Sequence, residues 1–429
     1  MKKLAINGGK KVRNKLFPMY KVIDDKEIKA VTKVLKSGIL SRFLGAWHLD
    51  FYGGPEVQKC EKAWAKMFGA KYAISVNSAT SGLIAALGAV GVKEGDEVIV
   101  TPYSMSISAT APLFYGAIPV FADVEPDYFC LDPKDVEKKI TKKTKAIIVV
   151  DLFGQPYDAD KINKIAKKHK IVVIEDTAQA PLARYKNKYA GTLGDIGVFS
   201  LNYHKHIHSG EGGIIVTNNK RYAERMQLIR NHAEAVVGPK KVTDLQNMVG
   251  FNFRMTEIEA TITNQQIKKL KTLLQKRIKN VDFLAKELSS IKFLNFSKVR
   301  PNTSHAFYVH PFLFDEKKAG ISRDVFIDAV KAELMPTENR VGEGVKIVSG
   351  YTRPLYELPV FQSLEFVGRK GDKKLMSKYK KVTCPVVADL HYNKLAFHEL
   401  MHANMTKTDL LDVVKAFKKV AENIDELKK

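Results

Sequence analysis

The sequence predicts an α/β fold, in which a large three-layer domain with a mostly parallel sheet is followed by a smaller α+β domain. Two observations lead to this prediction. From about Val57 to Thr217, short apolar runs alternate with stretches of helical periodicity. Such runs, separated by helices, are typical of parallel strands that are buried on both faces. After Thr217 the alternation stops, and one long helical pattern precedes a mixture of short strands and helices.

The predicted strands of the large domain are Tyr72–Val76, Glu97–Thr101, Ile118–Asp123, Ala146–Asp151, Ile171–Glu175, Gly197–Ser200 and Ile214–Thr217. Helical stretches such as Ser81–Val90 and Asp160–Lys168 lie between several of them. Ligands of such sheets bind outside the carboxyl ends of the strands. The residues that follow each run are therefore the candidates for a functional site.

A long helix is predicted from Thr256 to Leu288, where apolar residues recur mainly at helical spacing. We expect this helix to lead the chain out of the large domain. The predicted division is residues 1–260 for the large domain, with an N-terminal arm at 1–23, and residues 261–429 for the small domain.

The small domain is expected to contain a strand within Phe307–Phe314 and a final amphipathic helix from about Lys407. Thr406 and Asp409 have the spacing of a capping box, which favours that helix start. The stretch Arg340–Tyr351 is rich in glycine and polar residues. It is predicted to be a loop of the kind that often borders an active site.

The composition is that of a globular protein with a strong excess of positive charge. The 429 residues are 45% hydrophobic and 27% charged, and the formal net charge is +24. The basic residues are mostly lysines spread through nearly every helix-like stretch, which favours a solvated surface over a nucleic-acid interface. A positive field would also attract a substrate that carries phosphates.

Several features predict a cytoplasmic protein without a membrane segment. No apolar stretch has membrane-spanning length, and the start lacks the apolar region of an export signal. Cys60, Cys130 and Cys384 are far apart and odd in number, so we expect reduced, structural thiols.

The segment from Gly194 to Gly213, with Val173–Ala180 upstream, carries the main functional signal. Lys205 lies five residues after Ser200 and five before Gly210. Together these motifs resemble the DegT/DnrJ/StrS family of sugar aminotransferases, which use pyridoxal phosphate (PLP) in the fold of aspartate aminotransferase. The resemblance extends over nearly the whole chain. It implies a three-layer PLP-transferase large domain with a smaller C-terminal domain.

The resemblance implies that Lys205 binds the cofactor covalently and moves a proton during the reaction, which requires a deprotonated amine. A solvated charge is the structural alternative for any single lysine. Asp176 ends an apolar run, and the resemblance implies that its carboxylate holds the pyridine nitrogen of PLP protonated. A helix cap or a solvated strand end is the alternative for Asp176.

Further cofactor contacts are implied by the resemblance. Ala79 and Thr80 open a helix after a strand, where backbone N–H groups form a site for a phosphate, and Ser200 would add a second hydroxyl. The family usually has glycine at the position of Ala79. Gln179 would contact the ring near its phenolic oxygen, with packing as the alternative. Met105 stands where the family commonly places an aromatic residue over the ring, and a core methionine is an equal alternative.

Asn252 lies in Gly250–Glu257, which resembles the family segment that reaches the cofactor phosphate of the neighbouring subunit. This implies a homodimer with shared active sites, whereas capping of the long helix is the structural alternative. Tyr351 and Arg353 lie in a stretch that borders the substrate cleft in the family, and a surface role is the alternative for Arg353. The family also places the equivalent of His232 near this cleft.

Three histidines flank the candidate lysine, at positions 204, 206 and 208. Their spacing would put them on one face of a strand, but no cysteine is near and Glu211 breaks the periodicity. We therefore predict no metal site. A dehydratase branch of the family has histidine in place of the lysine. The spacing on both sides favours Lys205 over His204 and His206 at that position.

The resemblance predicts a PLP-dependent aminotransferase that transfers an amino group from L-glutamate to a keto-sugar linked to a nucleotide, for amino-sugar biosynthesis such as that of a surface polysaccharide. A keto-inositol acceptor remains open, because the Leu4–Gly9 and Ser37–Ser41 segments also occur in relatives that act on keto-inositols. A PLP-dependent sugar dehydratase is a second alternative. A non-catalytic basic binding protein on the same fold is a third.

Overall fold

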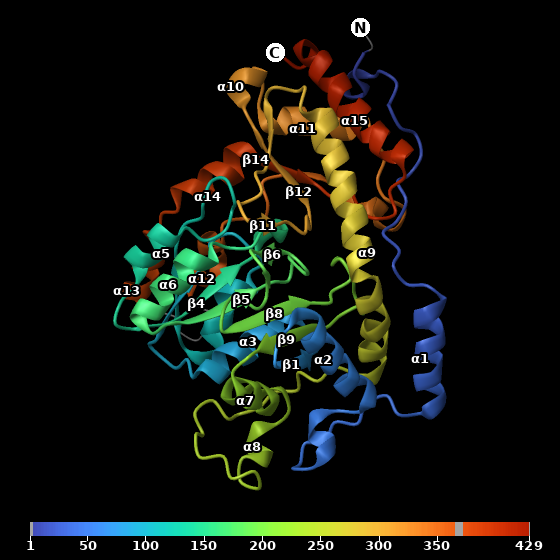
Figure 1. Ribbon diagram of the computed structural model, residues 1–429. Coiled ribbons are helices and arrows are strands. Elements are labelled where there is room, and N and C mark those ends of the chain that lie inside the picture. The colour runs from blue at the N-terminus through green and yellow to red at the C-terminus, as the bar shows by residue number, and fades with distance from the viewer. Residues whose placement is uncertain (1–2, 365–371, 429) are drawn as a thin grey trace.

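The computed structural model describes residues 3–364 and 372–428. The large domain is built on a seven-stranded sheet with the order β1-β9-β8-β5-β4-β2-β3 (Figure 1). Its strands are β1 (Tyr72–Val76), β2 (Glu97–Val100), β3 (Ile118–Phe121), β4 (Thr144–Val150), β5 (Val172–Asp176), β8 (Ile196–Ser200) and β9 (Gly213–Thr217). Within this sheet β9 runs antiparallel to both neighbours, and the other pairs are parallel. The predicted α/β fold with a mostly parallel sheet is confirmed.

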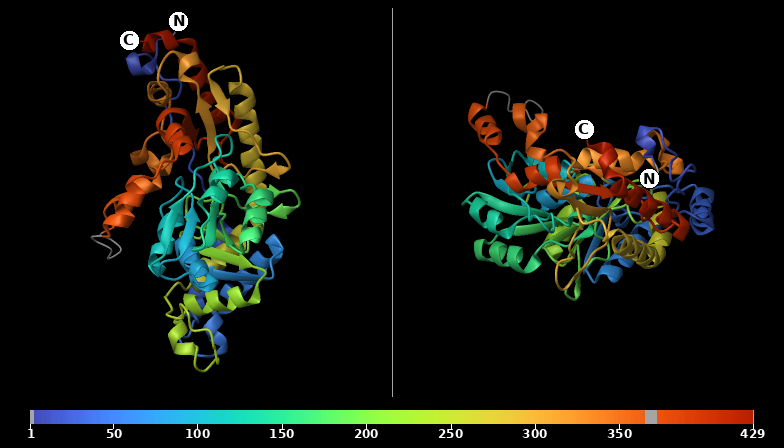
Figure 2. Two further views of the ribbon diagram at one scale, coloured as in Figure 1. Left: turned by 90° about the vertical axis from the view of Figure 1, so that its left-hand side faces the viewer. Right: turned by 90° about the horizontal axis from the view of Figure 1, so that it is seen from above.

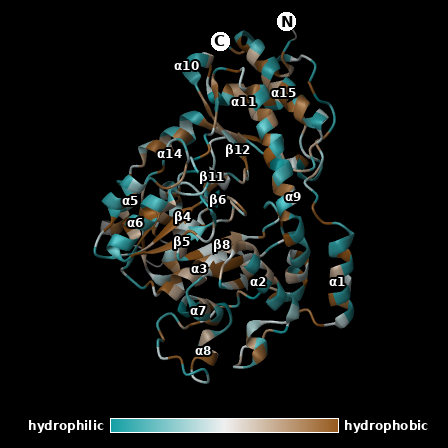
Figure 3. Ribbon diagram, in the orientation of Figure 1, coloured by the Kyte–Doolittle hydropathy of each residue, from teal (hydrophilic) through white to brown (hydrophobic). Residues whose placement is uncertain are grey.

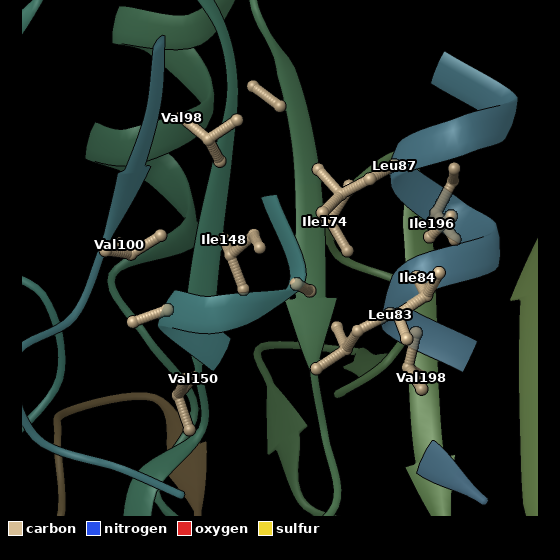
Figure 4. Close-up of a cluster of buried hydrophobic side chains, with 14 of the residues drawn as sticks. Leu83, Ile84, Leu87, Val98, Val100, Ile148, Val150, Ile174, Ile196 and Val198 are labelled. Carbon is tan, nitrogen blue, oxygen red and sulfur yellow. The ribbon is translucent and has the colours of Figure 1, made fainter. Parts of the chain in front are cut away.

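Helices cover both faces of this sheet because its strands are apolar on both sides. Alternate residues of each strand join different clusters, as Ile148 and Ile147 of β4 do. The first face packs against Leu83, Ile84 and Leu87 (Figure 4). The helices of this region are α2 (Pro55–Phe68), α3 (Ala79–Val90), α4 (Ile107–Thr110), α5 (Pro133–Lys139), α6 (Ala159–His169), α7 (Lys220–Arg230) and α8 (Ala233–Val236).

The hydrophilic residues gather on the outward faces of the helices, as Figure 3 shows for α5 and α6. Helix α6 buries Ile162 and Ala166 and exposes its lysines to solvent. This pattern is that of a surface helix with one apolar stripe. Among the described residues, no helix is long and apolar enough to span a membrane.

The long helix α9 (Glu257–Leu288) connects the two domains. It begins at a capping box in which Thr256 and Glu259 exchange hydrogen bonds. Its first half packs Ile267 and Leu270 against the large domain, and its second half packs Val281 and Leu284 into the core of the small domain. Figure 1 shows α9 passing along both domains, with α1 (Asp25–Ser37) beside its lower half.

The small domain has a four-stranded antiparallel sheet with the order β10-β12-β14-β13. Its strands are β10 (Leu294–Phe296), β12 (His310–Phe314), β13 (Ile347–Ser349) and β14 (Leu395–His398), and its helices are α10 (Glu316–Ala319), α11 (Arg323–Ala332) and α15 (Lys407–Glu422). Phe326 of α11 packs against Phe314 of the sheet, and Phe417 of α15 packs against Phe312. The capping box of Thr406 and Asp409 starts α15 as predicted.

The N-terminal arm packs against the small domain, although the expected division grouped it with the large domain. Leu4 and Phe17 belong to the apolar cluster of the small domain. The Ala5 N–H donates to Glu333 Oε1 at 2.8 Å, and Phe17 forms an isolated bridge with Thr337. Figure 1 shows both termini at the same end of the molecule. The arm packs on the small domain because its apolar side chains, Leu4 and Phe17, complete the apolar core of that domain.

Residues 354–364 and 372–390 also depart from the expected division, because they pack on the large domain and not on the small one. Their helices α12 (Pro359–Ser363), α13 (Lys373–Lys380) and α14 (Pro385–Asp389) return to the large domain (Figure 2). Phe361 and Tyr379 belong to the core of that domain, and the Tyr379 hydroxyl donates to the Pro119 carbonyl at 3.1 Å.

The stretch Arg340–Tyr351, predicted to be a loop, contains part of a short 3₁₀ helix (Glu338–Glu343) and strand β13. Pairing with β14 supplies the hydrogen bonds of this strand, and such long-range pairing has no local signal. A small third sheet joins β6 (Arg184–Tyr185), β7 (Lys188–Tyr189) and β11 (Thr303–Ser304) across the two domains.

Candidate active site

Asp176 is the last residue of β5, at the carboxyl edge of the parallel sheet. Its side chain is buried, with Oδ2 accepting from the Ser108 hydroxyl at 2.9 Å and Oδ1 accepting from the Ala178 N–H at 3.2 Å. Burial raises the pKa of Asp176, and the two hydrogen bonds and the charge of Lys205 oppose that rise. The carboxylate is thus fixed in one orientation at the edge where ligands bind.

Lys205 lies in the turn that follows β8, and its side chain is buried. Its Nζ is 4.3 Å from the centre of the Tyr308 ring. Burial lowers the pKa of Lys205 from 10.5 to about 8, while the charges of Asp176 and Glu399 oppose the shift. A lysine with such a pKa has a neutral, nucleophilic amine at mildly alkaline pH.

A candidate anion site is formed where α3 begins. Ser78 caps this helix, its Oγ accepting from the Ser81 N–H at 3.0 Å, and Thr80 in the first turn is exposed. Strand β9 brings this helix start close to Ser200, because Gly212 bridges to Ser78 and Gly213 pairs with Ser200. The free N–H groups of a helix start, with nearby hydroxyl groups, are suited to a phosphate.

The close approach of β9 to α3 requires glycine. A Cβ added at Gly213 would lie 2.7 Å from the backbone nitrogen of Ala79 and 2.6 Å from the carbonyl carbon of Ser78. The Cβ of Ala79 is accommodated, since the helix start has its ordinary capped geometry.

Gln179 and Tyr351 form one wall of the site, although they are far apart in the sequence. Gln179 Oε1 accepts from the Phe153 N–H at 2.8 Å, and its Nε2 donates to the Tyr351 hydroxyl at 3.1 Å. Burial raises the pKa of Tyr351, so this hydroxyl stays protonated. The oxygen and the nitrogen of the Gln179 side-chain amide are therefore both hydrogen-bonded within the protein, and the amide orients Tyr351.

Met105 and Arg353 are exposed at the surface of the described chain. Met105 lies in the loop after β2 with 55% of its surface exposed. This exposure disagrees with the alternative of a core methionine and leaves the side chain available to a ligand. Arg353 is paired with Glu357 at 2.9 Å on the surface, which matches the structural alternative.

Asn252 and His232 lie together beside the segment that leads into α3. Asn252 is exposed, and its Oδ1 accepts from Arg254 Nε at 2.8 Å. Its carbonyl accepts from Asn77 Nδ2 at 3.4 Å, within the same chain. His232 has a positive φ of 50° at the start of α8, and its Nδ1 is 3.6 Å from Glu234. The capping alternative for Asn252 does not apply, because Thr256 caps α9.

The three histidines near Lys205 do not share one face. His206 is buried, with Nε2 2.8 Å from the Ala306 carbonyl, while the ring of His204 contacts Tyr203 at a tilt of 41° with ring centres 3.7 Å apart. His208 lies farther along the turn, where its Nδ1 accepts from the Gly210 N–H at 3.3 Å. In the described part of the chain, no group of three potential metal ligands is present.

The structure adds two residues that the sequence did not indicate. Ser108 binds the Asp176 carboxylate from the helical segment after β2, and Tyr308 covers Lys205 from the small domain. A serine in a helix has no local sign of such a contact. Tyr308 lies within the run predicted as a strand, but its contact with Lys205 depends on how the two domains pack.

The comparison with known families covers most of the chain. Residues 21–417 match the model of the DegT/DnrJ/EryC1/StrS aminotransferase family. The chain belongs to this family. The resemblance seen in the sequence is thereby confirmed, together with the prediction that the protein is an aminotransferase.

Individual relatives match this family member over nearly their whole length. A putative L-glutamine:3-amino-2,3-dideoxy-scyllo-inosose aminotransferase of Streptoalloteichus tenebrarius is 31% identical, and the match covers 99% of each chain. The spore coat polysaccharide biosynthesis protein SpsC of Bacillus subtilis is 29% identical over 94% of this chain and 96% of its own. The crystal structure of an aminotransferase from Psychrobacter cryohalolentis superposes with a TM-score of 0.79 at 28% identity, covering 95% of this chain and 100% of that one.

Proposed function

We propose that this chain is a PLP-dependent aminotransferase that transfers an amino group from L-glutamate to a keto-sugar linked to a nucleotide. The observation that carries the proposal is that Lys205 and Asp176 are both buried at the carboxyl edge of the sheet, where each charge influences the pKa of the other. Lys205 combines burial with a pKa of about 8, and a buried carboxylate lies near enough to influence that pKa. A perturbed amine beside a fixed carboxylate is what covalent binding of a pyridine aldehyde requires.

The residues present fit pyridoxal phosphate. Asp176 offers a buried carboxylate for a protonated ring nitrogen, and the start of α3 with Thr80 and Ser200 offers donors for the phosphate. When bound, the cofactor supplies an aldehyde that binds amines and a ring that accepts electrons from the neighbouring carbon. The exposed Met105 and the wall of Gln179 and Tyr351 would border the ring.

Within this arrangement each residue has a definite task. Lys205 Nζ binds the cofactor when neutral, and when free it accepts and returns a proton. Asp176 holds the proton on the ring nitrogen, and Ser108 keeps its carboxylate in place. Tyr308 covers Lys205 and keeps water from the amine, as its 4.3 Å ring contact supports.

The class of acceptor is proposed from the relatives. SpsC is named for polysaccharide biosynthesis, and a protein that is 37% identical over 56% of this chain is a GDP-perosamine synthase of Escherichia coli O157:H7. A keto-inositol acceptor is the second candidate, because the Streptoalloteichus relative is named for an inosose. That name also gives L-glutamine as the amino donor, so both donors enter the test.

The dehydratase alternative is disfavoured by the surroundings of the histidines. His206 contacts the Ala306 carbonyl and His204 contacts the Tyr203 ring, whereas Lys205 is the member of this turn whose charge acts on Asp176. The same Lys205 and Asp176 arrangement argues against a binding protein without catalysis.

The working unit proposed here is a homodimer in the cytoplasm, with active sites shared between subunits. Asn252 is exposed beside the α3 start and is free to face a second copy. Two-fold dimers are the commonest closed assemblies. The cysteines are buried free thiols, which fits a reducing compartment.

The decisive experiment incubates the purified holoenzyme with L-glutamate or L-glutamine and a panel of keto-sugar nucleotides and keto-inositols. Formation of 2-oxoglutarate, or of the keto acid of glutamine, together with an aminated product identified by mass spectrometry, is the expected result. The Lys205→Ala variant is the control without turnover. A product that has lost water and gained no nitrogen would identify a dehydratase instead.

A further inference from the structure

A cavity of about 300 Å³ adjoins the turn that carries Lys205. It lies between the N-terminal arm, the middle of α9 and the small domain. Tyr308, whose ring lies 4.3 Å from Lys205 Nζ, also lines this cavity. The charged residues of its wall are Lys21, Arg277, Arg340, Lys346 and Glu399.

Arg277 of α9 is unusual among the buried arginines of this chain. The described part of the chain buries six of them, namely Arg13, Arg225, Arg230, Arg277, Arg300 and Arg323. Five form an ion pair with a carboxylate, their partners being Asp409, Asp244, Glu61, Glu125 and Asp324. For Arg277, which is 5% exposed, no ion pair with any described carboxylate is present.

The surroundings of Arg277 are neutral. Its Nη1 donates to the Phe307 and Tyr308 carbonyls at 3.1 and 2.9 Å, and its guanidinium lies 5.3 Å from the centre of the Tyr20 ring. Burial raises the pKa of Tyr20, so this phenol stays uncharged. A guanidinium keeps its charge at any working pH, and a buried charge without a counter-ion is costly.

The two half-buried cations of the cavity, Arg340 and Lys346, already have carboxylate partners, and Lys21 is exposed to solvent. Arg340 is held between Glu343 and Glu399, and Lys346 is paired with Glu343. Arg277 is thus the buried cation of this wall whose charge is open to a ligand. A carboxylate matches the planar fork of a guanidinium and would supply the missing charge.

We propose that this cavity is the amino-donor site and that Arg277 binds a carboxylate of the donor. The inference rests on the proposed aminotransferase function. The cavity is at the small end of the range of about 300 to 1,000 Å³ for ligand sites, which suits a five-carbon amino acid better than a nucleotide sugar. The cavity reaches Tyr308, whose ring lies 4.3 Å from Lys205 Nζ, so a donor bound there would lie close to the reacting amine.

The test compares three variants of the holoenzyme. Arg277→Gln removes the charge, Arg277→Lys keeps a charge but loses the fork, and Lys276→Gln makes the same change of net charge at the neighbouring exposed position of α9. The measurements are the glutamate concentration that gives half-maximal change of the cofactor spectrum, binding of 2-oxoglutarate by calorimetry, and the KM for the keto-sugar.

For Arg277→Gln we expect that glutamate concentration to rise about 10- to 100-fold, the loss typical of a charged hydrogen bond. Calorimetry should show 2-oxoglutarate binding weakened to the same extent, whereas the KM for the keto-sugar should change little. Arg277→Lys should recover part of the loss and Lys276→Gln should match the wild type. Arg277→Lys also serves as the informative variant if Arg277→Gln does not fold.

Two outcomes would overturn the inference. Equal glutamate affinity in Arg277→Gln and Lys276→Gln would show that Arg277 does not bind the donor. A rise confined to the KM for the keto-sugar would show that the guanidinium binds a phosphate of the acceptor. A wild-type holoenzyme that gives no spectral change with glutamate or glutamine would refute the proposed function itself, which is a different failure.

Discussion

Lys205 differs from the other lysines of this chain in its surroundings. Most of the others lie on helix surfaces, whereas Lys205 is buried between the carboxyl edge of the sheet and the Tyr308 ring. Burial disfavours its charged form, and the negative charges of Asp176 and Glu399 limit the shift to a pKa of about 8. The surrounding fold therefore sets the reactivity of this residue.

The first prediction concerns the pH dependence of cofactor capture. Since only the neutral amine reacts, the rate at which apoprotein takes up pyridoxal phosphate should rise about tenfold per pH unit below pH 8 and level off above it. Stopped-flow absorbance measures this rate. Asp176→Asn should move the midpoint to lower pH, because the Asp176 charge raises the Lys205 pKa.

In Lys205→Ala the visible band that borohydride bleaches should be missing, and peptide mapping of the treated wild type should find the label on Lys205. Label on another lysine, or a midpoint near the ordinary lysine pKa, would contradict this assignment.

The second prediction concerns Asp176. Asp176→Asn should lower turnover by at least about 100- to 1,000-fold while cofactor still binds, because the ring nitrogen loses the charge that keeps it protonated. Ser108→Ala should have a smaller effect, since it removes one hydrogen bond and leaves the carboxylate. Steady-state kinetics with a cofactor titration measures both. Near-normal turnover in Asp176→Asn would assign this carboxylate a structural role.

At the scale of elements, the start of α3 depends on its contact with β9. Strand β9 places Gly213 against the backbone of Ala79, and Gly213 also pairs with Ser200 of β8. The start of α3 and the end of β8, which are remote in the sequence, thereby form one proposed phosphate site.

The third prediction tests this contact. Gly213→Ala should destabilise the protein by about 1–3 kcal/mol, because the new Cβ would lie 2.7 Å from the Ala79 nitrogen. It should also weaken cofactor binding by displacing the helix start. Gly238→Ala is the matched control, since a Cβ there meets no atom within 4 Å. Denaturant unfolding and cofactor titration measure the two effects. Lower stability with unchanged cofactor affinity would place the phosphate elsewhere.

At the scale of the whole molecule, the two domains are joined by chain segments that pack on the domain away from their place in the sequence. Residues 3–23 pack on the small domain, and residues 354–364 and 372–390 pack on the large one. Each domain thus contains chain from the other half of the sequence. The cavity beside Lys205 depends on the position of the arm, because the arm supplies Tyr20 to its wall and the small domain supplies Glu399.

The fourth prediction concerns the proposed homodimer. If Asn252 serves the partner's site, then Lys205→Ala and Asn252→Ala, each nearly inactive, should restore activity when their subunits are exchanged. Equal amounts make half of the dimers mixed, and each mixed dimer has one site with both changes and one with neither. About a quarter of all sites should then be intact. No recovery after verified exchange would show that Asn252 acts within its own chain.

The sequence by itself determined the family, the parallel sheet and the helix starts at Thr256 and Thr406, because periodicity, caps and motif spacing are local signals. It also singled out Lys205 and Asp176. Tertiary structure alone decided the rest. The Gln179–Tyr351 bond joins residues 172 positions apart, and strand β13 formed where a loop was predicted.

The neutral surroundings of Arg277 are likewise a feature that only the tertiary structure shows. The sequence shows an arginine in a long helix and gives no sign that its neighbours are the Phe307 and Tyr308 carbonyls and the Tyr20 ring. Burial, charge compensation and the walls of a cavity depend on contacts between segments far apart along the chain. Those contacts are fixed by the packing of both domains, and local sequence patterns do not contain them.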